Sequence, residues 1–323
     1  MAEGAVDINR TVFNEEAANY DEKHRKLHER LTREFHERLD FIGVDWASED
    51  EDEDDTDGDE VEASDKKPKR EVRLLDYACG TGMMSRALAP YVTQCVGMDI
   101  AESMVLTYNT RAENQGLTPD EMHAVLGNLT SETVSDALLS PELFGFDIAV
   151  VGGGFHHFGD PALAAKRLVE RLKPGGVLLI WDFLPHGPLH QHEHHHDHSH
   201  QHRQHQHDHD HHDHGHGHAK DNGKQDTAPD VYRSVMHHGF SEAQMREIFT
   251  GAGAGDGFEM HVVGGGFTLG HHGHGPEAQG NDKDKSKKDG STDQNNDEDK
   301  DREARRRQVF FARGTKKGAA AEG

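Results

Sequence analysis

The sequence predicts an α/β fold: a doubly wound, mostly parallel seven-stranded sheet with an antiparallel edge hairpin and disordered inserts. Strand-like runs alternate with helical patterns from Val72 to Trp181, which is typical of a parallel sheet with helices on both faces. These runs are almost continuously apolar, as expected of strands that are buried on both sides. The last two runs follow one another without a helix between them, which favours antiparallel pairing at the sheet edge.

The most informative stretch runs from Leu74 to Asp99. An apolar run leads into a glycine turn over Asp76–Gly82, and a helical pattern follows from Met83 to about Tyr91. A second strand, Cys95–Met98, then ends on Asp99. Glycines let the backbone approach a ligand closely, and the first turn of the next helix offers free N–H groups. Asp99 follows at close to the roughly 20-residue spacing of an acid that binds ribose hydroxyls.

The turn does not fit the dinucleotide fingerprint. That fingerprint requires G-x-G-x-x-G, and Ser85 stands where the third glycine should be. A nicotinamide-dependent oxidoreductase is therefore the less favoured enzyme reading. A glycine-rich turn that binds no ligand is the structural alternative.

The N-terminal 46 residues are rich in helix-forming patterns. Apolar residues recur every four positions over Lys23–Phe41, at Leu27, Leu31, Phe35 and Leu39, which predicts one narrow apolar stripe on a charged helix. We expect this helix to pack on the edge of the domain. The family resemblance described below implies the alternative, a lid that closes over a bound ligand.

The remaining elements follow in order after Asp99. Their predicted ranges are a helix over Ile100–Asn114, a strand over His123–Leu126, a helix around Ser135–Leu139, a strand over Phe146–Val151, a helix over Pro161–Leu172, a turn at Lys173–Gly176, a strand over Val177–Trp181, a helix over Ser241–Thr250 with Ser241 as its N-cap, and strands over Phe258–Val263 (extendable to Leu269) and Gln308–Arg313.

Polar and small residues follow several of these strands at their carboxyl ends. Ligands of open α/β sheets bind beyond those ends, so the loops are expected to converge on one site. The segments concerned are Asp76–Gly82, Asp99, Asn128, Gly152–His157 and Asp182.

Three polar segments interrupt the predicted domain, because they lack the apolar residues that repay ordering entropy. Residues 47–70 form an acidic linker that ends in the basic run 66–70, a solubilising linker or a nuclear-import signal. Residues 186–228 hold a histidine-rich tract. We interpret it as a surface repeat or, because imidazoles bind Zn, Ni and Cu, as a divalent-metal store.

The predicted organisation is a helical lid segment at 1–46, the linker at 47–70, a catalytic domain at 71–270 interrupted by 186–228, a polar insert at 271–303, a last strand at 304–313 and a loose tail at 314–323.

The composition limits the classes of partner. The chain has 323 residues and a formal net charge of −25, which argues against nucleic acid or an anionic membrane as a partner. The two cysteines, Cys79 and Cys95, form no disulfide framework and suit a reducing compartment. No apolar signal segment or membrane span is evident, so we expect a soluble, cytoplasmic protein.

The glycine turn resembles the D-x-G-x-G-x-G motif of class I S-adenosylmethionine-dependent methyltransferases. Asp76, Gly80 and Gly82 match the motif, and Ala78 replaces its first glycine. The runs LLDYACGTG, VGMDIAESM, FDIAVVGGGFHHF and RLVERLKPGGVLLIWDF extend the resemblance to the small-molecule branch similar to ubiquinone- and menaquinone-biosynthesis enzymes.

The resemblance implies a Rossmann-like methyltransferase fold, S-adenosyl-L-methionine as cofactor and a small or medium organic molecule as methyl acceptor. It implies that the glycine turn approaches the methionine part of the cofactor, that Asp99 holds the ribose, and that Tyr20 lies near the cofactor. The residues to which it assigns cofactor binding are Asp76, Ala78, Gly80, Thr81, Gly82, Asp99, Ile100, Met104, Asn128, Leu129 and Gly152.

Histidines are the candidate catalytic bases, because imidazole titrates near neutral pH. His156 and His157 follow the fourth strand and are the first candidates, whereas His237 and His238 lie in a segment expected to cover the substrate. Each pair has a purely structural alternative, a histidine hydrogen-bonded within a loop.

A metal-binding or scaffolding protein on a degenerate methyltransferase fold is the alternative function, and no metal site is assigned within the core.

Overall fold

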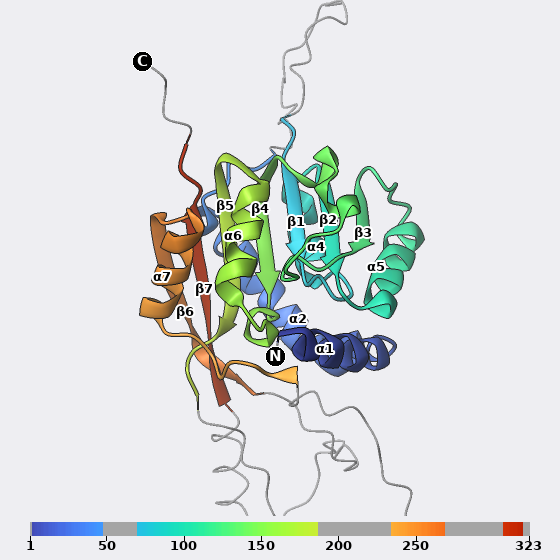
Figure 1. The fold of residues 1–323 in the computed structure, drawn as a ribbon, viewed down its shortest axis with the longest axis horizontal. Coiled ribbons are helices and arrows are strands. Elements are labelled where there is room, and N and C mark those ends of the chain that lie inside the picture. The colour runs from blue at the N-terminus through green and yellow to red at the C-terminus, as the bar shows by residue number, and fades with distance from the viewer. Residues whose placement is uncertain (1, 48–69, 187–233, 269–305, 319–323) are drawn as a thin grey trace, which may run out of the picture.

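The computed structural model describes residues 2–47, 70–186, 234–268 and 306–318, which form one mixed sheet with helices on both faces (Figure 1). The sheet has seven strands in the order β3-β2-β1-β4-β5-β7-β6. β1 to β5 are parallel, and β7 pairs antiparallel with both β5 and β6. The predicted fold class, including the antiparallel edge, is confirmed. The strands are β1 (Arg73–Tyr77), β2 (Gln94–Asp99), β3 (Met122–Leu126), β4 (Phe146–Gly152), β5 (Leu172–Phe183), β6 (Asp256–Thr268) and β7 (Arg306–Thr315).

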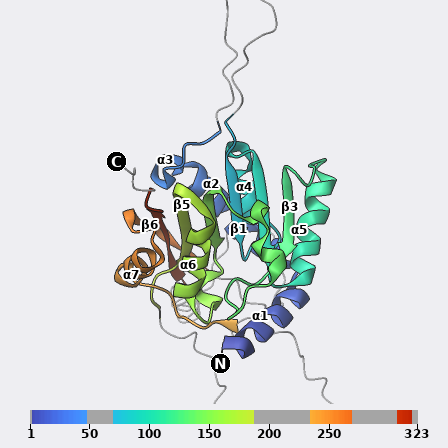
Figure 2. The same ribbon diagram turned by 45° about the horizontal axis from the view of Figure 1, so that its top comes forward.

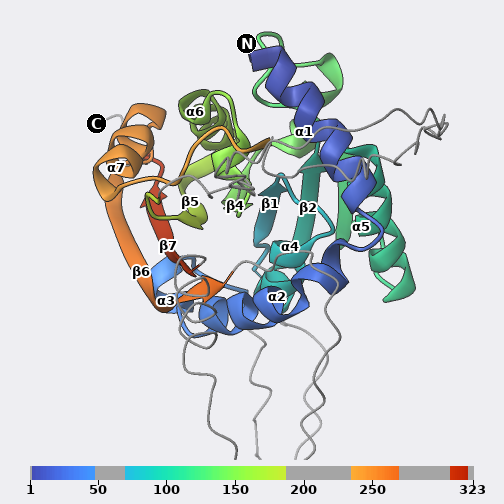
Figure 3. The same cartoon turned by 90° about the horizontal axis from the view of Figure 1, so that it is seen from below.

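Helices cover the two faces of the sheet, as Figure 3 shows in a view along it. α6 and α7 lie on one face, whereas α2 and α4 lie on the other. The α-helices are α1 (Ala2–Glu16), α2 (Tyr20–His36), α3 (Leu39–Ile42), α4 (Met83–Leu88), α5 (Glu102–Asn114), α6 (Pro161–Arg171) and α7 (Glu242–Ala252), and the 3-10 turns are η1 (Ala89–Tyr91), η2 (Asp136–Leu139), η3 (Pro141–Leu143) and η4 (Phe155–His157).

Two hydrophobic clusters fill the layers between sheet and helices. Alternate residues of one strand enter different clusters: Leu178 and Ile180 pack with α6 and α7, and Leu179 and Trp181 pack with α2 and α4. The strands are therefore buried on both faces, which is why their sequences are continuously apolar rather than alternating.

The N-terminal stripe packs onto the second cluster. Leu31 and Phe35 are fully buried there, and Leu27 and Leu39 pack against it. The predicted single helix over Lys23–Phe41 is wrong in its continuity, because α2 ends at His36 and a short α3 follows. The chain bends at Arg38, and Leu39 still reaches the same cluster.

The predicted turn at Lys173–Gly176 lies inside a longer strand. β5 begins at Leu172, and its register with β4 shifts between the pairs Phe146–Leu172 and Ile148–Val177. The extra residues of β5 are accommodated at this shift, where Gly175 has a φ of +82°. The segment is thus an irregularity of the strand. In a separate correction, the predicted helix at 135–139 is a 3-10 turn.

Most of the polar segments lie outside the described residues, including the basic run up to Lys69, the histidine-rich tract beyond His186 and the insert at 271–303. β7 extends to Thr315, two residues into the predicted tail. No helix within the described ranges is both long and apolar enough to cross a membrane. Within the same ranges, no group of three or more His, Cys, Asp or Glu side chains is arranged to hold a metal ion.

Candidate active site

The glycine turn and Asp99 are joined directly. The Asp99 carboxylate accepts the Gly80 N–H at 2.8 Å and the Ala101 N–H at 2.9 Å. Both bonds are possible because β1 and β2 are adjacent and parallel, so the turn and the acid emerge at the same edge. Burial raises the pKa of Asp99, and the backbone N–H groups oppose that effect. The Ile100 N–H also stabilises the charged carboxylate, which still has acceptor capacity for a further donor.

Asp76 is a fully buried carboxyl group below this turn. One of its oxygens accepts the N–H and the hydroxyl of Ser85 at 3.0 and 2.8 Å. The other, Oδ1, has no hydrogen-bond partner in the described part of the chain. Burial raises the pKa of Asp76 to about 7, because the charged form is poorly solvated. An unpaired buried acceptor of this kind is suited to a cationic group.

The three predicted ligand glycines differ in their surroundings. A Cβ on Gly82 would lie 2.7 Å from the Tyr108 ring, and one on Gly152 would lie 2.5 Å from Met84. A Cβ on Gly80 would meet nothing within 4 Å. Gly82 and Gly152 are therefore required by packing, whereas only Gly80 faces open space. Ala78, which replaces the first glycine of the motif, also adopts a positive φ of 55°.

This difference predicts that two alanine substitutions lower the stability by unequal amounts. We expect Gly82→Ala to lower the free energy of unfolding by roughly 2–5 kcal/mol, from positive-φ strain and from overpacking against Tyr108. Gly80→Ala costs only the backbone strain, roughly 1–2 kcal/mol, because its Cβ enters open space. Chemical denaturation of both variants checks this, and equal losses would contradict the assignment.

The N-terminal helices contact the loops at the carboxyl edge. α1 lies across this edge beside one end of α5 (Figures 1 and 2). Asn14 donates to Glu102 and accepts the Ser103 N–H, both at 2.8 Å, and Asn9 donates to the His157 carbonyl at 2.9 Å. The segment thus reaches loops that follow two different strands.

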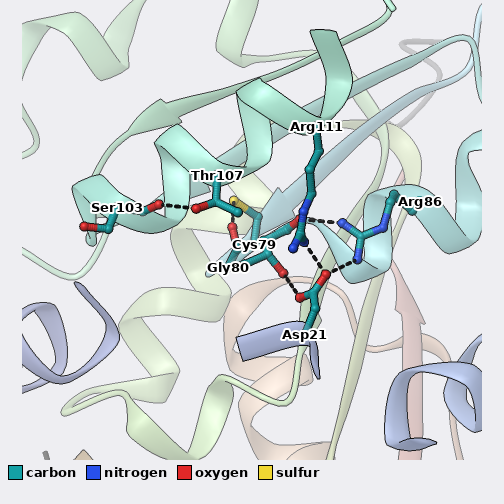
Figure 4. A network of polar contacts seen from close by, with 8 residues as sticks. Asp21, Cys79, Gly80, Arg86, Ser103, Thr107 and Arg111 are labelled. Carbon is teal, nitrogen blue, oxygen red and sulfur yellow. Dashed lines mark hydrogen bonds and ion pairs between the residues drawn. The ribbon is translucent and has the colours of Figure 1, made fainter. Parts of the chain in front are cut away.

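Tyr20 and Asp21, at the start of α2, contact the predicted cofactor region. Tyr20 packs against the cluster of Ala17, Ala101 and Met104, and burial together with Asp99 raises its pKa to about 12. The Asp21 carboxylate accepts the Thr81 hydroxyl and forms ion pairs with Arg86 and Arg111 (Figure 4). Tyr20 therefore lies close to Asp99.

His156 is held by a carboxylate at the end of β5. Its Nδ1 lies 2.9 Å from Asp182 Oδ1, and its backbone N–H donates to Oδ2 at 3.0 Å. A carboxylate only accepts, so Nδ1 carries the proton and the Nε2 lone pair is free to accept one. This pairing fits a general base. The sequence analysis predicted that Asp182 lies at the same edge of the sheet, but it did not predict the contact with His156.

The rings of two other candidate histidines, His157 and His237, bond to backbone carbonyls, whereas for His238 the bonded group is its own carbonyl. The Nδ1 of His157 lies 2.9 Å from the Ser234 carbonyl, and burial lowers its pKa well below the usual range. The Nε2 of His237 lies 3.0 Å from the Phe158 carbonyl, and the His238 carbonyl accepts the His186 N–H. The segment from Ser234 to Phe240 thus lies against the loop after β4, and no carboxylate within the described residues orients these rings.

The predicted adenine-side residues divide into two groups. Ile100 is partly exposed next to Asp99, and Asn128 uses its side-chain oxygen for Thr130 at 2.8 Å. Met104 and Leu129 are buried, the first against the N-terminal segment and the second in the main core. The Leu129 backbone, rather than its side chain, faces polar neighbours, since its N–H bonds the Tyr77 hydroxyl at 3.1 Å.

Comparison with known proteins identifies the class. A family model described as a methyltransferase domain matches residues 26–222, more than half of the chain, so the chain belongs to this methyltransferase family.

Two curated relatives and one solved structure illustrate the similarity. An uncharacterised methyltransferase of Schizosaccharomyces pombe is 33% identical over 128 residues, which cover 38% of this chain and 44% of that protein. The demethylmenaquinone methyltransferase of Thermus thermophilus is 35% identical over 127 residues, which cover 38% of this chain and 51% of that protein. The chain therefore spans about half the length of these relatives. The crystal structure of YcgJ from Bacillus subtilis aligns with 77% of this chain and 93% of its own, with a TM-score of 0.43 and 15% identity.

The buried Asp76 predicts a measurable pH dependence. Its pKa is 3.8 in the unfolded chain and about 7 in the folded protein, so the unfolded state loses this proton at lower pH. The free energy of unfolding of the wild type therefore falls as the pH rises between these two values. Relative to wild type, Asp76→Asn should gain roughly 1.4 kcal/mol of unfolding free energy per pH unit from pH 5 to 7 and then level off. Urea unfolding at several pH values measures this difference, and a constant difference would contradict it.

Proposed function

We propose that the protein transfers a methyl group from S-adenosyl-L-methionine to an oxygen or nitrogen atom of a small or medium organic acceptor. The observation that carries the proposal is the hydrogen bond between Asp99 and Gly80, which joins a ribose-type acid to a glycine turn with open space beside it. His156 and Asp182, at the ends of β4 and β5, supply a base at the same edge of the sheet.

The residues present fit this cofactor. Asp99 has lone pairs left for the two ribose hydroxyls, and Gly80 leaves room for the methionine part. The unpaired Oδ1 of Asp76 suits the ammonium group of an amino acid. The cofactor, when bound, supplies a methyl group that is already activated on a sulfonium. The protein has mainly to align the acceptor, and alignment alone supplies roughly 7–11 kcal/mol of the barrier reduction.

His156 takes up the proton that an acceptor hydroxyl or amine loses. Asp182 fixes the tautomer of the ring and places its carboxylate beside the imidazolium that forms during transfer. The acceptor therefore belongs on the side of β4 and β5, beneath the segment that carries His237 and His238.

The N-terminal segment 1–46 acts as a lid over the cofactor. Its contacts to Thr81, Ser103 and His157 connect it to three loops of the site, so closure excludes water from all three at once. Limited proteolysis tests this role: S-adenosylmethionine should slow cleavage in residues 1–46 several-fold, and unchanged cleavage would contradict it.

Calorimetric titration with S-adenosylmethionine and NAD, run side by side, tests the proposed function. We expect saturable binding of the first with a dissociation constant in the micromolar range and no binding of the second. Binding of NAD alone would support the oxidoreductase reading, and binding of neither would support a degenerate fold.

A further inference from the structure

A cationic hollow lies between α2 and α4, beside the glycine turn. It has a volume of about 500 Å³. Arg25, His28 and Arg33 of α2 line it opposite Met83 and Arg86 of α4, and Asp21 stands at its boundary. Neither Gly80 nor Asp99 lines it, so it is a different space from the one assigned above to the cofactor.

The charges around the hollow do not cancel. Glu29 pairs with Arg25 at 2.9 Å, and Asp21 is shared between Arg86 and Arg111. In the described part of the chain, Arg33 has no carboxylate partner and is exposed to solvent. Of the charged groups that line the hollow, three guanidinium groups (Arg25, Arg33 and Arg86) thus face two carboxylates (Asp21 and Glu29). This is an excess of positive charge on a chain whose formal net charge is −25.

The arginines retain donors for a ligand. Arg86 uses one N–H for the Thr81 carbonyl at 2.5 Å and another for Asp21 at 3.2 Å (Figure 4). A guanidinium has five N–H donors, so others remain. Burial lowers the pKa of Arg86, Asp21 opposes that effect and Arg111 adds to it. A further anion beside Arg86 would stabilise its charged form as Asp21 does. His28 offers a ring nitrogen from the facing helix.

From this arrangement we infer that the hollow between α2 and α4 is a second binding site, for a phosphate group. Fork-shaped arginine side chains match the oxygens of phosphate, and the volume is large enough for a phosphate ester of a small metabolite. Because Arg86 also holds Asp21, occupation of this site is linked to the contact between α2 and the glycine turn.

The test is a calorimetric titration of the full chain with inorganic phosphate and, separately, with glycerol 3-phosphate, at constant ionic strength. Wild-type protein should bind saturably, Arg33→Gln should bind at least tenfold more weakly, and Arg33→Lys should recover part of the affinity. Arg246→Gln on α7, an exposed arginine in an i, i+4 ion pair, is the matched control and should bind like wild type. Tighter binding of the ester would identify a phosphorylated metabolite as the source, and equal binding would identify free phosphate.

Three results would overturn the inference. They are the absence of saturable binding in wild type, equal losses in Arg33→Gln and Arg246→Gln, and full displacement of phosphate by S-adenosylmethionine. The last result would place the anion in the cofactor site. The inference does not depend on the proposed function, because the binding of phosphate and its loss in Arg33→Gln are measured without cofactor or acceptor.

Discussion

Asp99→Ala is expected to weaken the binding of S-adenosylmethionine at least tenfold. The side chain offers charged acceptors to the ribose hydroxyls, and loss of a hydrogen bond to a charged group costs roughly 1.5–3 kcal/mol. Calorimetry with the purified variant measures the change.

Asp99 also holds the glycine turn through the Gly80 N–H, so a second variant is needed to separate binding from folding. Asp99→Asn retains one acceptor oxygen and removes the charge, and it should bind with intermediate affinity. Asp136→Ala, an exposed acid on η2, is the control and should bind like wild type. A folded Asp99→Ala protein with wild-type affinity would remove the ribose assignment.

His156→Gln is expected to lower the rate of methyl transfer by roughly 10²–10⁴-fold, the usual contribution of a general base. Asp182→Asn should lower the rate at least roughly tenfold, because it removes the group that sets the tautomer of His156. The affinity for S-adenosylmethionine should stay within about twofold in both variants, since neither residue is assigned to the cofactor.

The rate is measured with labelled cofactor and the best acceptor from a panel of hydroxylated and amino aromatic compounds. His123→Gln, which alters a histidine remote from the site at β3, is the control. A His156→Gln enzyme with the wild-type rate would show that the pair is structural.

The parts of the fold that depend on local patterns could be predicted from the sequence. The order of strands and helices from β1 to β5 follows from apolar runs and helical spacing, and α7 has the predicted capping box at Ser241 and Gln244. The bend between α2 and α3 was missed because the apolar stripe continues through it to Leu39 without a glycine or proline. The Lys173–Gly176 turn was misplaced because the irregularity in β5 uses the same residues as a tight turn.

The candidate site was predictable where a turn and a strand end define it, as for Gly80 and Asp99. The pairs that complete it join residues far apart in the sequence. Asp182 meets His156 only because β4 and β5 are neighbours, and Asp21 meets Thr81 only because α2 packs on α4. Sequence also cannot separate Gly80, which faces open space, from Gly82, which avoids the Tyr108 ring.

The most direct test of the account is a crystal structure of the full chain with S-adenosylhomocysteine. We predict density for the nucleoside at the carboxyl ends of β1 and β2, with the ribose hydroxyls within hydrogen-bonding distance of Asp99 and the amino-acid part beside Gly80. Density for the nucleoside at any other place, or a well-ordered Asp99 without a ribose contact, would contradict it.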